Sequence, residues 1–404
     1  MKIIQINCVY NTGSTGKITE CIHKCLLNDS YESIVIYGRG KKIKQKGIYK
    51  VGNELYSKFN HFICNITGLM YGFCFFNTNK IISIIKKEKP DVVHLQCING
   101  YFVNIYRLLI FLKKSNIKTV LTLHAEFMYT GNCGIALECD KWLAGCGKCP
   151  RLKKETGSYF FDNTRLSWKK MNNAFKNFNN NLTIVSVSPW LMGRAKMSPL
   201  LKDKHHEVIL NGLDTDIFHY YQDSKLLKKE LNIENKKVIF HATPSFDNDA
   251  NSLKGGYYVL KLAEMFLNND DVIFVVAGLY PSDIIVPKNV ILLGKITDQK
   301  YLAKLYSMSD VTVLTSKRET FSMIVAESLC CGTPIVGFKA GGPELIAIKE
   351  YSDFVEYGDV YNLYKLINEN FNKGKNKLSI SENSITKYNK NNMYYQYKLI
   401  YDKK

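Results

Sequence analysis

The sequence predicts an α/β protein made of two doubly wound, Rossmann-like domains. The chain has 404 residues, which is longer than one ordinary hydrophobic core requires. Strand-like runs that are apolar on both faces alternate with longer amphipathic segments, as in parallel sheets covered by helices. An Asn-Gly turn signal near residues 211–218 separates two such halves. This alternation over two halves is typical of paired doubly wound domains.

The expected elements follow one another regularly along the chain. Strands are expected at residues 2–8, 33–37, 92–95, 119–124, 182–187, 238–241, 272–277, 290–293, 311–315 and 334–338, and helices at 257–266, 299–308 and 323–331. We therefore expect a first domain at residues 1–205 and a second at 206–385. A helix at 386–404 is expected to pack back on the first domain.

Positive charge is concentrated in the first half of the chain. Residues 1–200 contain 29 Lys and Arg against 11 Asp and Glu, whereas residues 201–404 contain 26 against 25. Such a surface favours anionic partners, although a Lys- and Asn-rich composition can also reflect an AT-biased genome. No helix-turn-helix, zinc-finger or RNP-like motif accompanies the charge, so a nucleic-acid partner is not expected.

From this sequence we expect neither a signal peptide nor a membrane span. The N-terminus lacks a cationic region followed by a long apolar run. The most apolar segment, residues 61–77, is shorter than the ~20 residues that a span needs and contains polar residues, so a buried or interfacial helix is expected there. We expect a cytoplasmic protein with peripheral contact to an anionic inner membrane face.

A glycine-rich turn follows the first expected strand. Residues 12–17, TGSTGK, lie between that strand and a helical pattern, where backbone N–H groups can approach a phosphate. The spacing of Gly13 and Gly16 fits neither the Walker pattern nor the dinucleotide fingerprint. The turn is therefore either a phosphate contact or a plain tight turn.

Two glutamates eight residues apart lie in residues 317–332, KRETFSMIVAESLCCG. Glu319 falls in a loop after an expected strand, and Glu327 falls on the second turn of a helix that starts near Ser322. Carboxylates at this place can accept hydrogen bonds from sugar diols, and the N–H groups of Ser322 and Met323 offer an anion site. By spacing alone, a solvated helix face is the favoured interpretation of the two glutamates.

The surrounding residues distinguish these two readings. The E-x7-E segment, followed by GTPIV at 332–336 and GGPE at 341–344, resembles the signature of glycosyltransferase family 4. The resemblance covers nearly the whole chain and is strongest over 305–346. It implies the GT-B fold, in which two Rossmann-like domains face each other across a cleft, and sugar transfer with retention. Glu319 would then hold the transferred sugar, Glu327 the ribose, and Phe321 would belong to the donor site.

The resemblance extends to a lysine in the second half. Lys254-Gly255 resembles the family's Lys-Gly pair, whose ammonium meets the donor diphosphate. The Arg that relatives usually carry shortly before this pair is absent, because residues 241–244 read His-Ala-Thr-Pro. Thr243 is assigned to the donor site, and Arg318 or another loop would have to replace the missing cation.

In the first half, His124 ends an expected strand and matches a family histidine that hydrogen-bonds the transferred sugar. Many relatives continue with Asp, but here Ala125 comes next and then Glu126. The role of that Asp is therefore absent or has moved to Glu126. The loop of Gly13 and Gly16 is expected to close over the donor diphosphate.

Four cysteines form a block that resembles one in a subset of bacterial surface-polysaccharide transferases. The block contains Cys133, Cys139, Cys146 and Cys149, and the last two have the C-x2-C spacing at which thiolates share a tetrahedral metal. Structural zinc, disulfides and buried free thiols all stay open for this block.

The sequence therefore predicts an enzyme that moves a hexose-type sugar from a UDP- or GDP-sugar to a glycan or polyprenyl-phosphate-linked acceptor in surface polysaccharide synthesis. The resemblance implies that catalysis requires no metal cofactor. Glu319, His124 and Lys254 are the expected catalytic residues. The alternatives are a non-catalytic GT-B partner subunit and a sugar phosphorylase or epimerase on the same fold.

Overall fold

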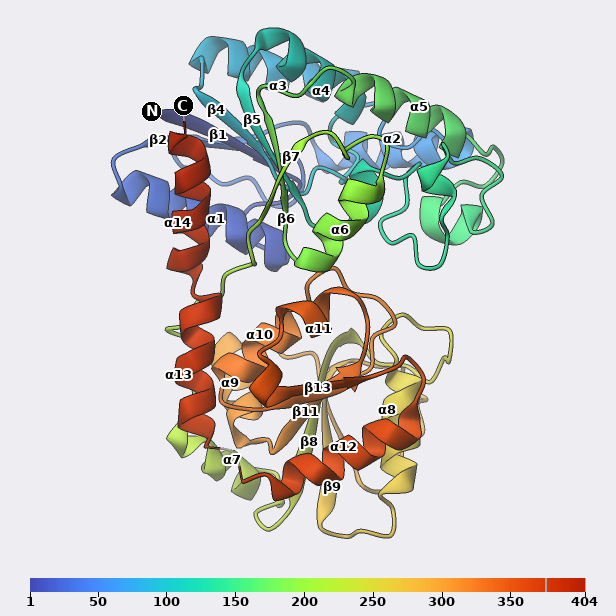
Figure 1. Cartoon of the computed structure of the whole chain (residues 1–404), viewed down its shortest axis with the longest axis vertical. Coiled ribbons are helices and arrows are strands. Elements are labelled where there is room, and N and C mark those ends of the chain that lie inside the picture. The colour runs from blue at the N-terminus through green and yellow to red at the C-terminus, as the bar shows by residue number, and fades with distance from the viewer. Residues whose placement is uncertain (375, 404) are drawn as a thin grey trace. The chain divides into compact units, whose positions relative to one another are not determined.

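The computed structural model describes residues 1–374 and 376–403, which separate into two compact units (Figure 1). Unit 1 comprises Met1–Ile209 with Tyr394–Lys404, and unit 2 comprises Leu210–Met393. Lys375 and Lys404, which fall in the expected segments 206–385 and 386–404, lie outside the described residues. Each unit has its own parallel sheet, and this confirms the predicted α/β class of two Rossmann-like domains.

The sheet of unit 1 has the strand order β3-β2-β1-β4-β5-β6-β7, and all its pairings are parallel. The strands are β1 Lys2–Asn7, β2 Glu32–Tyr37, β3 Ile48–Lys50, β4 Val92–Leu95, β5 Lys118–Leu123, β6 Leu182–Ser186 and β7 His205–Val208. The central strands are buried, because their aliphatic side chains are covered on both faces. The order reverses direction between β1 and β4.

The helices of unit 1 connect these strands as crossovers. They are α1 Gly13–Asn28, α2 Glu54–Thr67, α3 Phe75–Glu88, α4 Ile105–Ser115, α5 Thr164–Phe175 and α6 Pro189–Met197. Between β5 and α5 the chain forms only short turns, η1 Glu126–Met128, η2 Lys141–Leu143 and η3 Leu152–Thr156. This long loop region contains the four-cysteine block.

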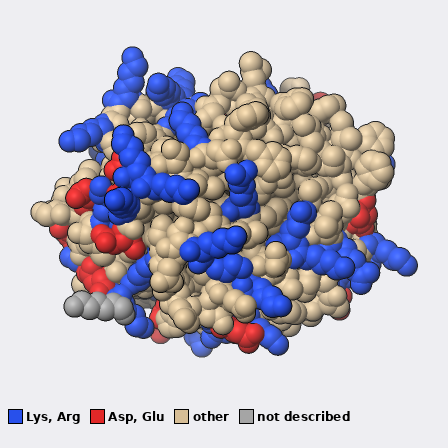
Figure 2. All heavy atoms as spheres, turned by 90° about the horizontal axis from the view of Figure 1, so that it is seen from above, with Lys and Arg blue, Asp and Glu red and all other residues tan. Residues whose placement is uncertain are grey.

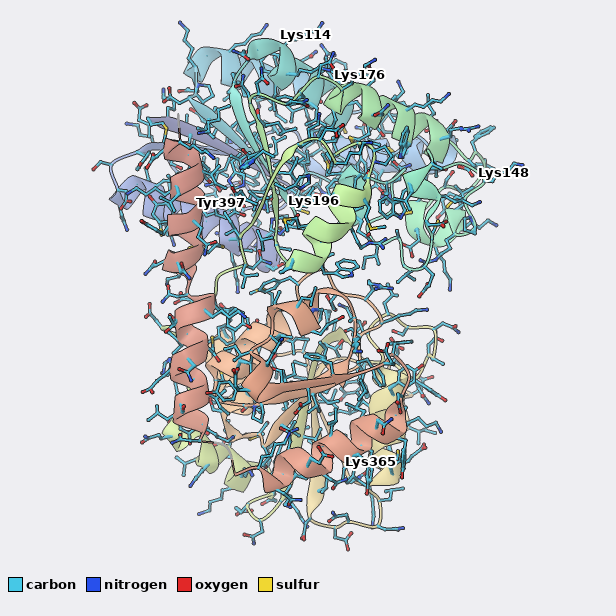
Figure 3. All side chains as sticks on the ribbon, viewed as in Figure 1. Lys114, Lys148, Lys176, Lys196, Lys365 and Tyr397 are labelled. Atoms are coloured by element: carbon cyan, nitrogen blue, oxygen red, sulfur yellow. The ribbon has the colours of Figure 1, made fainter. Side chains whose placement is uncertain are left out.

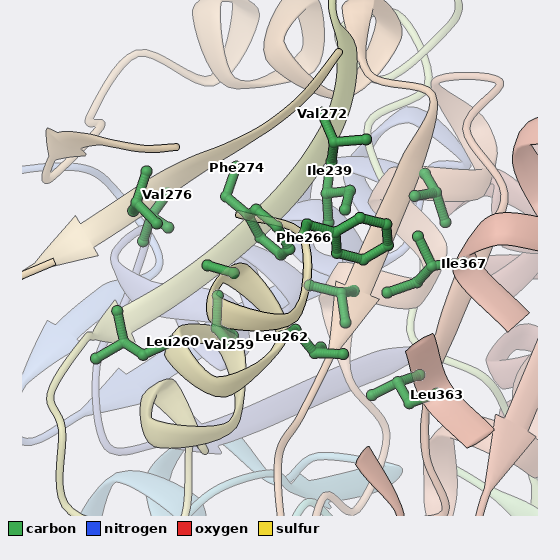
Figure 4. Close-up of a cluster of buried hydrophobic side chains, with 14 of the residues drawn as sticks. Ile239, Val259, Leu260, Leu262, Phe266, Val272, Phe274, Val276, Leu363 and Ile367 are labelled. Carbon is green, nitrogen blue, oxygen red and sulfur yellow. The ribbon is translucent and has the colours of Figure 1, made fainter. Parts of the chain in front are cut away.

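Unit 2 repeats the same topology with the order β10-β9-β8-β11-β12-β13. The strands are β8 Lys237–Ser245, β9 Val272–Leu279, β10 Val290–Gly294, β11 Val311–Leu314, β12 Ile335–Phe338 and β13 Ser352–Val355. The helices are α7 Lys225–Glu230, α8 Gly256–Met265, α9 Gln299–Met308, α10 Met323–Cys330, α11 Gly342–Ile346, α12 Val360–Asn372 and α13 Lys377–Tyr388, with turns η4 Gln222–Ser224 and η5 Lys349–Tyr351. Figure 4 shows part of its core, in which Phe266 and Phe274 pack among aliphatic side chains from β8, α8 and α12.

The last helix, α14 Lys390–Asp402, attaches to the sheet of unit 1 through buried tyrosines. Tyr397, labelled in Figure 3, has its hydroxyl 2.9 Å from the Thr122 hydroxyl on β5. The Tyr401 hydroxyl lies 2.7 Å from His94 Nδ1 on β4, and His94 Nε2 lies 2.8 Å from Thr122 Oγ1. His94 is fully buried, so this strand-end histidine serves the core of unit 1.

The apolar segment at 61–77 does not form the single helix that the sequence indicated. Helix α2 ends at Thr67 because Gly68 adopts the left-handed conformation, with φ 67°, and α3 begins only at Phe75. No helix among the described residues is long and apolar enough to cross a membrane. On the face drawn in Figure 2, blue Lys and Arg side chains are more prominent than red Asp and Glu side chains.

Candidate active site

The strongest candidate site lies where the strand order of unit 2 reverses, between β8 and β11. Open α/β sheets bind ligands outside the carboxyl ends of strands at such a reversal. The segments that follow these two strands carry Lys254 and Glu319. Lys254 Nζ donates to Glu319 Oε1 at 2.7 Å, and the two side chains are 34% and 18% exposed. The fold thus pairs two predicted site residues that are 65 positions apart in the sequence.

A glycine fixes the position of Lys254. Gly255 precedes helix α8 with φ 71°, and a Cβ atom there would lie 2.1 Å from the carbonyl oxygen of Thr315. The hydroxyl of Thr315 donates to the carbonyl of Lys254 at 3.3 Å, and the N–H of Lys317 donates to the carbonyl of Leu253 at 2.9 Å. The segment around Lys254 is therefore held tightly against the end of β11.

The loop of Glu319 is held by backbone hydrogen bonds to the next loop. The Glu319 N–H donates to the Ala340 carbonyl at 3.0 Å, and the Gly342 N–H donates to the Glu319 carbonyl at 2.9 Å. The Glu344 carboxylate accepts from the N–H groups of Ala340 and Gly341 at 2.9–3.0 Å. Glu344 therefore caps α11 and positions the backbone that supports Glu319.

The predicted anion site at the start of α10 coincides with backbone strain. Ser322 precedes Met323, the first residue of the helix, and has φ 78° and ψ 99°, which is uncommon for a non-glycine residue. Phe321 and Ser322 are buried, and Met323 is partly buried. Such strain clusters at functional sites, where the surrounding structure imposes the conformation.

Glu327 lies on α10, as predicted, and is partly buried. Its Oε2 accepts from the Tyr306 hydroxyl of α9 at 3.1 Å. Burial raises the pKa of Tyr306 well above its ordinary value, so this hydroxyl stays a donor. The sequence reasoning missed Tyr306, because in the sequence it reads only as an apolar position of an amphipathic helix.

The end of β8 carries no cation where relatives are expected to have one. Thr243 is partly buried, and its hydroxyl donates to the carbonyl of Ser245 at 2.8 Å. His241 is buried, its Nδ1 lies 3.0 Å from the Val313 carbonyl, and burial lowers its pKa to about 4. His241 is therefore neutral near pH 7, and Lys254 is the cation placed beside Glu319.

In unit 1, His124 directly follows β5 and is partly buried. Its Nε2 lies 2.9 Å from Gln96 Oε1, and burial lowers the pKa of His124 to about 4. A neutral imidazole with an accepting amide oxygen at Nε2 carries its proton there. The sequence reasoning missed Gln96, although its place just beyond the adjacent strand β4 was the available signal.

Glu126, the residue that could take over the role of the absent Asp, is engaged by the protein itself. It is fully buried, and its carboxylate accepts from Arg194 Nε at 2.5 Å, the Tyr129 hydroxyl at 2.9 Å and the Ala136 N–H at 2.7 Å. These three donors occupy the carboxylate and tie the loop after β5 to α6. Of the two alternatives for the absent Asp, this arrangement favours the loss of its role over a transfer to Glu126.

The TGSTGK turn is the first turn of α1. Gly13 begins the helix with φ 63°, and Gly16 lies within it, where a Cβ atom would come 3.1 Å from Val9 Cγ2. Gly16 is buried and Gly13 is exposed. Close packing thus explains Gly16 without a ligand, whereas a phosphate contact at Gly13 stays a prediction.

The four cysteines of the loop region line one cavity of about 20 Å³, together with Trp142. All are free thiols, and Cys133 hydrogen-bonds Cys149, which lowers the pKa of Cys149 below its usual value. Burial raises the pKa of Cys146 to about 11. No group of three or more His, Cys, Asp or Glu side chains in the described ranges is placed to hold a metal ion, so zinc binding by this block stays a prediction.

Comparisons with known proteins agree with this geometry. The family described as glycosyl transferases group 1 matches residues 223–387, which include Lys254, Glu319 and Glu327. WcaC of Escherichia coli (strain K12), named as a colanic acid biosynthesis glycosyl transferase, is 21% identical over 386 residues, covering 91% of this chain and 90% of its own. N-acetyl-alpha-D-glucosaminyl L-malate synthase of Bacillus anthracis is 26% identical over 39% of this chain and 42% of its own.

Solved structures share the fold at low sequence identity. HepE of Anabaena in complex with UDP aligns with a TM-score of 0.64 at 14% identity, covering 99% of both chains. A glycosyltransferase from Rickettsia africae ESF-5 aligns with a TM-score of 0.65 at 16% identity, covering 99% of this chain and 97% of its own. Residues 223–387 therefore match the glycosyl transferases group 1 family, and the whole chain shares the GT-B fold of these solved structures.

Proposed function

We propose that this glycosyltransferase moves a hexose-type sugar, with retention, from a nucleoside-diphosphate sugar to a glycan or lipid-linked acceptor in surface polysaccharide synthesis. The Lys254–Glu319 pair at the strand reversal of unit 2 carries the proposal. The complexes of HepE with UDP and with UDP-glucose support a nucleotide-sugar donor. The relationship to WcaC supports a role in polysaccharide synthesis.

The ion pair suggests how the donor is received. Lys254 and Glu319 neutralise each other's charge, with Nζ and Oε1 2.7 Å apart. When the donor binds, its diphosphate competes for the Lys254 ammonium, and the Glu319 carboxylate becomes free to accept hydrogen bonds from the sugar hydroxyls. Negative charge grows on the leaving phosphate during transfer, and a preorganised ammonium stabilises it. This lysine supplies positive charge without a metal ion.

The remaining donor contacts are assigned to the neighbouring segments. The N–H groups of Ser322 and Met323 at the start of α10 would hold the diphosphate, and Glu327 would accept from the ribose diol. Phe321 and Thr243 would shape the donor site, and the exposed Gly13 is assigned to the diphosphate.

His124 is assigned to the transferred sugar. Because its lowered pKa keeps it neutral, it would act as a hydrogen-bonding group and not as a general acid. Retention follows if the acceptor attacks from the side of the leaving phosphate, which then takes the acceptor's proton. The acceptor is assigned to the basic unit 1.

A donor screen tests the proposal. Purified protein is incubated without added metal, in the presence and absence of EDTA, with UDP-, GDP-, ADP- and dTDP-sugars, and nucleoside diphosphate release is measured. We expect release from one donor, insensitive to EDTA, and a loss of roughly 100- to 1,000-fold in kcat/KM for Glu319→Gln. The exposed Glu350→Gln is the matched control and should retain activity.

The alternatives give different outcomes. Turnover that depends on inorganic phosphate, or that forms an isomer without acceptor, indicates a phosphorylase or an epimerase. If no nucleoside diphosphate is released from any donor, even with polyprenyl-phosphate-linked acceptors present, the protein is a non-catalytic partner subunit. Unchanged turnover in Glu319→Gln contradicts the assigned role of the ion pair.

A further inference from the structure

Helix α2 of unit 1 has inverted polarity. Its buried residues are Ser57, Asn60 and Cys64. Its outer face instead presents Leu55, Phe59 and Phe62, at the i, i+4, i+7 spacing of one helix face, and these side chains are 78%, 58% and 60% exposed. A surface helix of a globular protein normally has the opposite arrangement, so this outer face is built to contact something apolar.

Two neighbouring segments extend this surface. The Asn60 side chain accepts from the Cys74 N–H at 2.8 Å, which fixes the start of α3 beside α2, and the exposed Phe75 and Phe76 follow directly. The Tyr56 and Phe76 rings lie 6.0 Å apart. The Asn65 carbonyl accepts from the Tyr159 N–H at 2.9 Å, which fixes the exposed residues 159–161, Tyr-Phe-Phe, at the other end of α2.

We call the outer face of α2, residues 75–76 and residues 159–161 the apolar face. The surrounding chain is strongly basic. Residues 39–80 contain eight Lys and Arg residues and a single acidic residue, Glu54. Glu54 forms ion pairs with Arg39 at 2.7 Å and with Lys50 at 3.8 Å, so the charge of even this carboxylate is neutralised. Lys58 on α2, Lys80 on α3 and the lysines of residues 41–46 and 153–154 are exposed.

We propose that the apolar face is a membrane-docking surface that inserts its aromatic side chains into a bilayer of anionic phospholipids, with the lysines contacting the headgroups. Large apolar side chains on one helix face, flanked by Lys and Arg, are typical of helices that lie in the membrane interface. A symmetric pairing of two copies of this chain through the same face would bring the two basic rims together, which like-charge repulsion opposes.

Vesicle co-sedimentation at low salt tests the proposal on the full chain. Vesicles of phosphatidylcholine with 30% phosphatidylglycerol are compared with pure phosphatidylcholine. We expect the wild-type protein to bind the anionic vesicles, and the double variant Phe59→Glu/Phe62→Glu to partition at least about tenfold less. Lys58→Glu/Lys80→Glu should weaken binding to anionic vesicles and make the remaining binding less dependent on salt.

The matched control is Leu226→Glu/Lys229→Glu on helix α7 of unit 2, where both side chains lie outside the core, and it should bind like the wild type. Equal binding of the wild type and the Phe59→Glu/Phe62→Glu variant overturns the proposal. The proposal is also overturned if the wild-type protein does not bind vesicles but forms dimers, and light scattering shows that the Phe59→Glu/Phe62→Glu variant is monomeric. The measurement needs neither sugar donor nor acceptor. A negative result would therefore refute the membrane-docking proposal without bearing on the proposed transfer reaction.

Discussion

His94 shows how a single buried polar group ties distant parts of the chain together. Its Nδ1 contacts the Tyr401 hydroxyl at 2.7 Å, across 307 positions of sequence. We expect Tyr401→Phe to lower the free energy of unfolding of unit 1 by about 1–3 kcal/mol, because His94 loses a partner inside the core. Urea unfolding followed by far-UV circular dichroism measures this change. Tyr395→Phe on the same helix removes an exposed hydroxyl and should be neutral, and equal losses in both variants would refute the account.

The same residues show what the sequence could and could not predict of the site. Lys254, Glu319 and Glu327 were assigned from their motif, and the fold places the first two in contact. The partners Gln96 and Tyr306 were missed because such contacts depend on which strands and helices become neighbours. Sequence spacing also could not reveal that the Glu126 carboxylate accepts a hydrogen bond from Arg194, since these residues are 68 positions apart.

At the level of elements, the junction between β8 and α8 depends on a glycine. We expect Gly255→Ala to lower the free energy of unfolding of unit 2 by more than the ~1 kcal/mol typical of a left-handed alanine, because its Cβ would lie 2.1 Å from the Thr315 carbonyl. It should also weaken binding of the donor nucleotide by displacing Lys254. Urea unfolding and isothermal titration calorimetry measure the two effects.

Gly294→Ala is the matched control for this prediction. Gly294 has nearly the same φ, 72°, but among the described residues no atom outside its chain neighbours lies within 4 Å of the position that an alanine methyl group would occupy. The Gly294→Ala variant therefore measures the cost of the backbone strain without the steric clash. If Gly255→Ala costs no more than Gly294→Ala, the close approach of Thr315 is not what demands glycine.

Buried strands were the elements most readily predicted, since a short, continuous apolar run between turn signals is typical of a strand covered on both faces. The short edge strands β3 and β13 were missed, because three or four residues carry little pattern. The segment at 61–77 was predicted to be one helix because it is predominantly apolar, and this pattern does not show that helix α2 ends before Gly68. Exposed aromatic residues near that stop follow no rule of core burial and could be recognised only in the folded chain.

For the whole molecule, buried histidines predict a loss of stability in mild acid. Burial lowers the pKa of His94 to about 3 and those of His124 and His241 to about 4. Their folded-state pKa values lie below the unfolded value of about 6.5, so the unfolded chain binds protons first as the pH falls. Stability is complete above about pH 6.5 and declines toward pH 4, by up to about 1.4 kcal/mol per pH unit for each histidine.

Urea midpoints at pH 7.5 and pH 5.5 check this prediction. Unit 1 contains His94 and His124 and should lose more stability than unit 2, which contains His241. Midpoints that do not shift between the two pH values would contradict the assignment of neutral, buried imidazoles.

The chain passes from unit 1 to unit 2 after Ile209 and returns after Met393. The returning segment, with Tyr397 and Tyr401, supplies the hydroxyl partners of Thr122 and His94. During synthesis on the ribosome, these partners emerge only after all of unit 2 has been made. Unit 2 can therefore complete its folding before unit 1, although unit 1 is synthesised first. A nascent chain that is interrupted within unit 2 would present an unfinished unit 1 to chaperones and proteases.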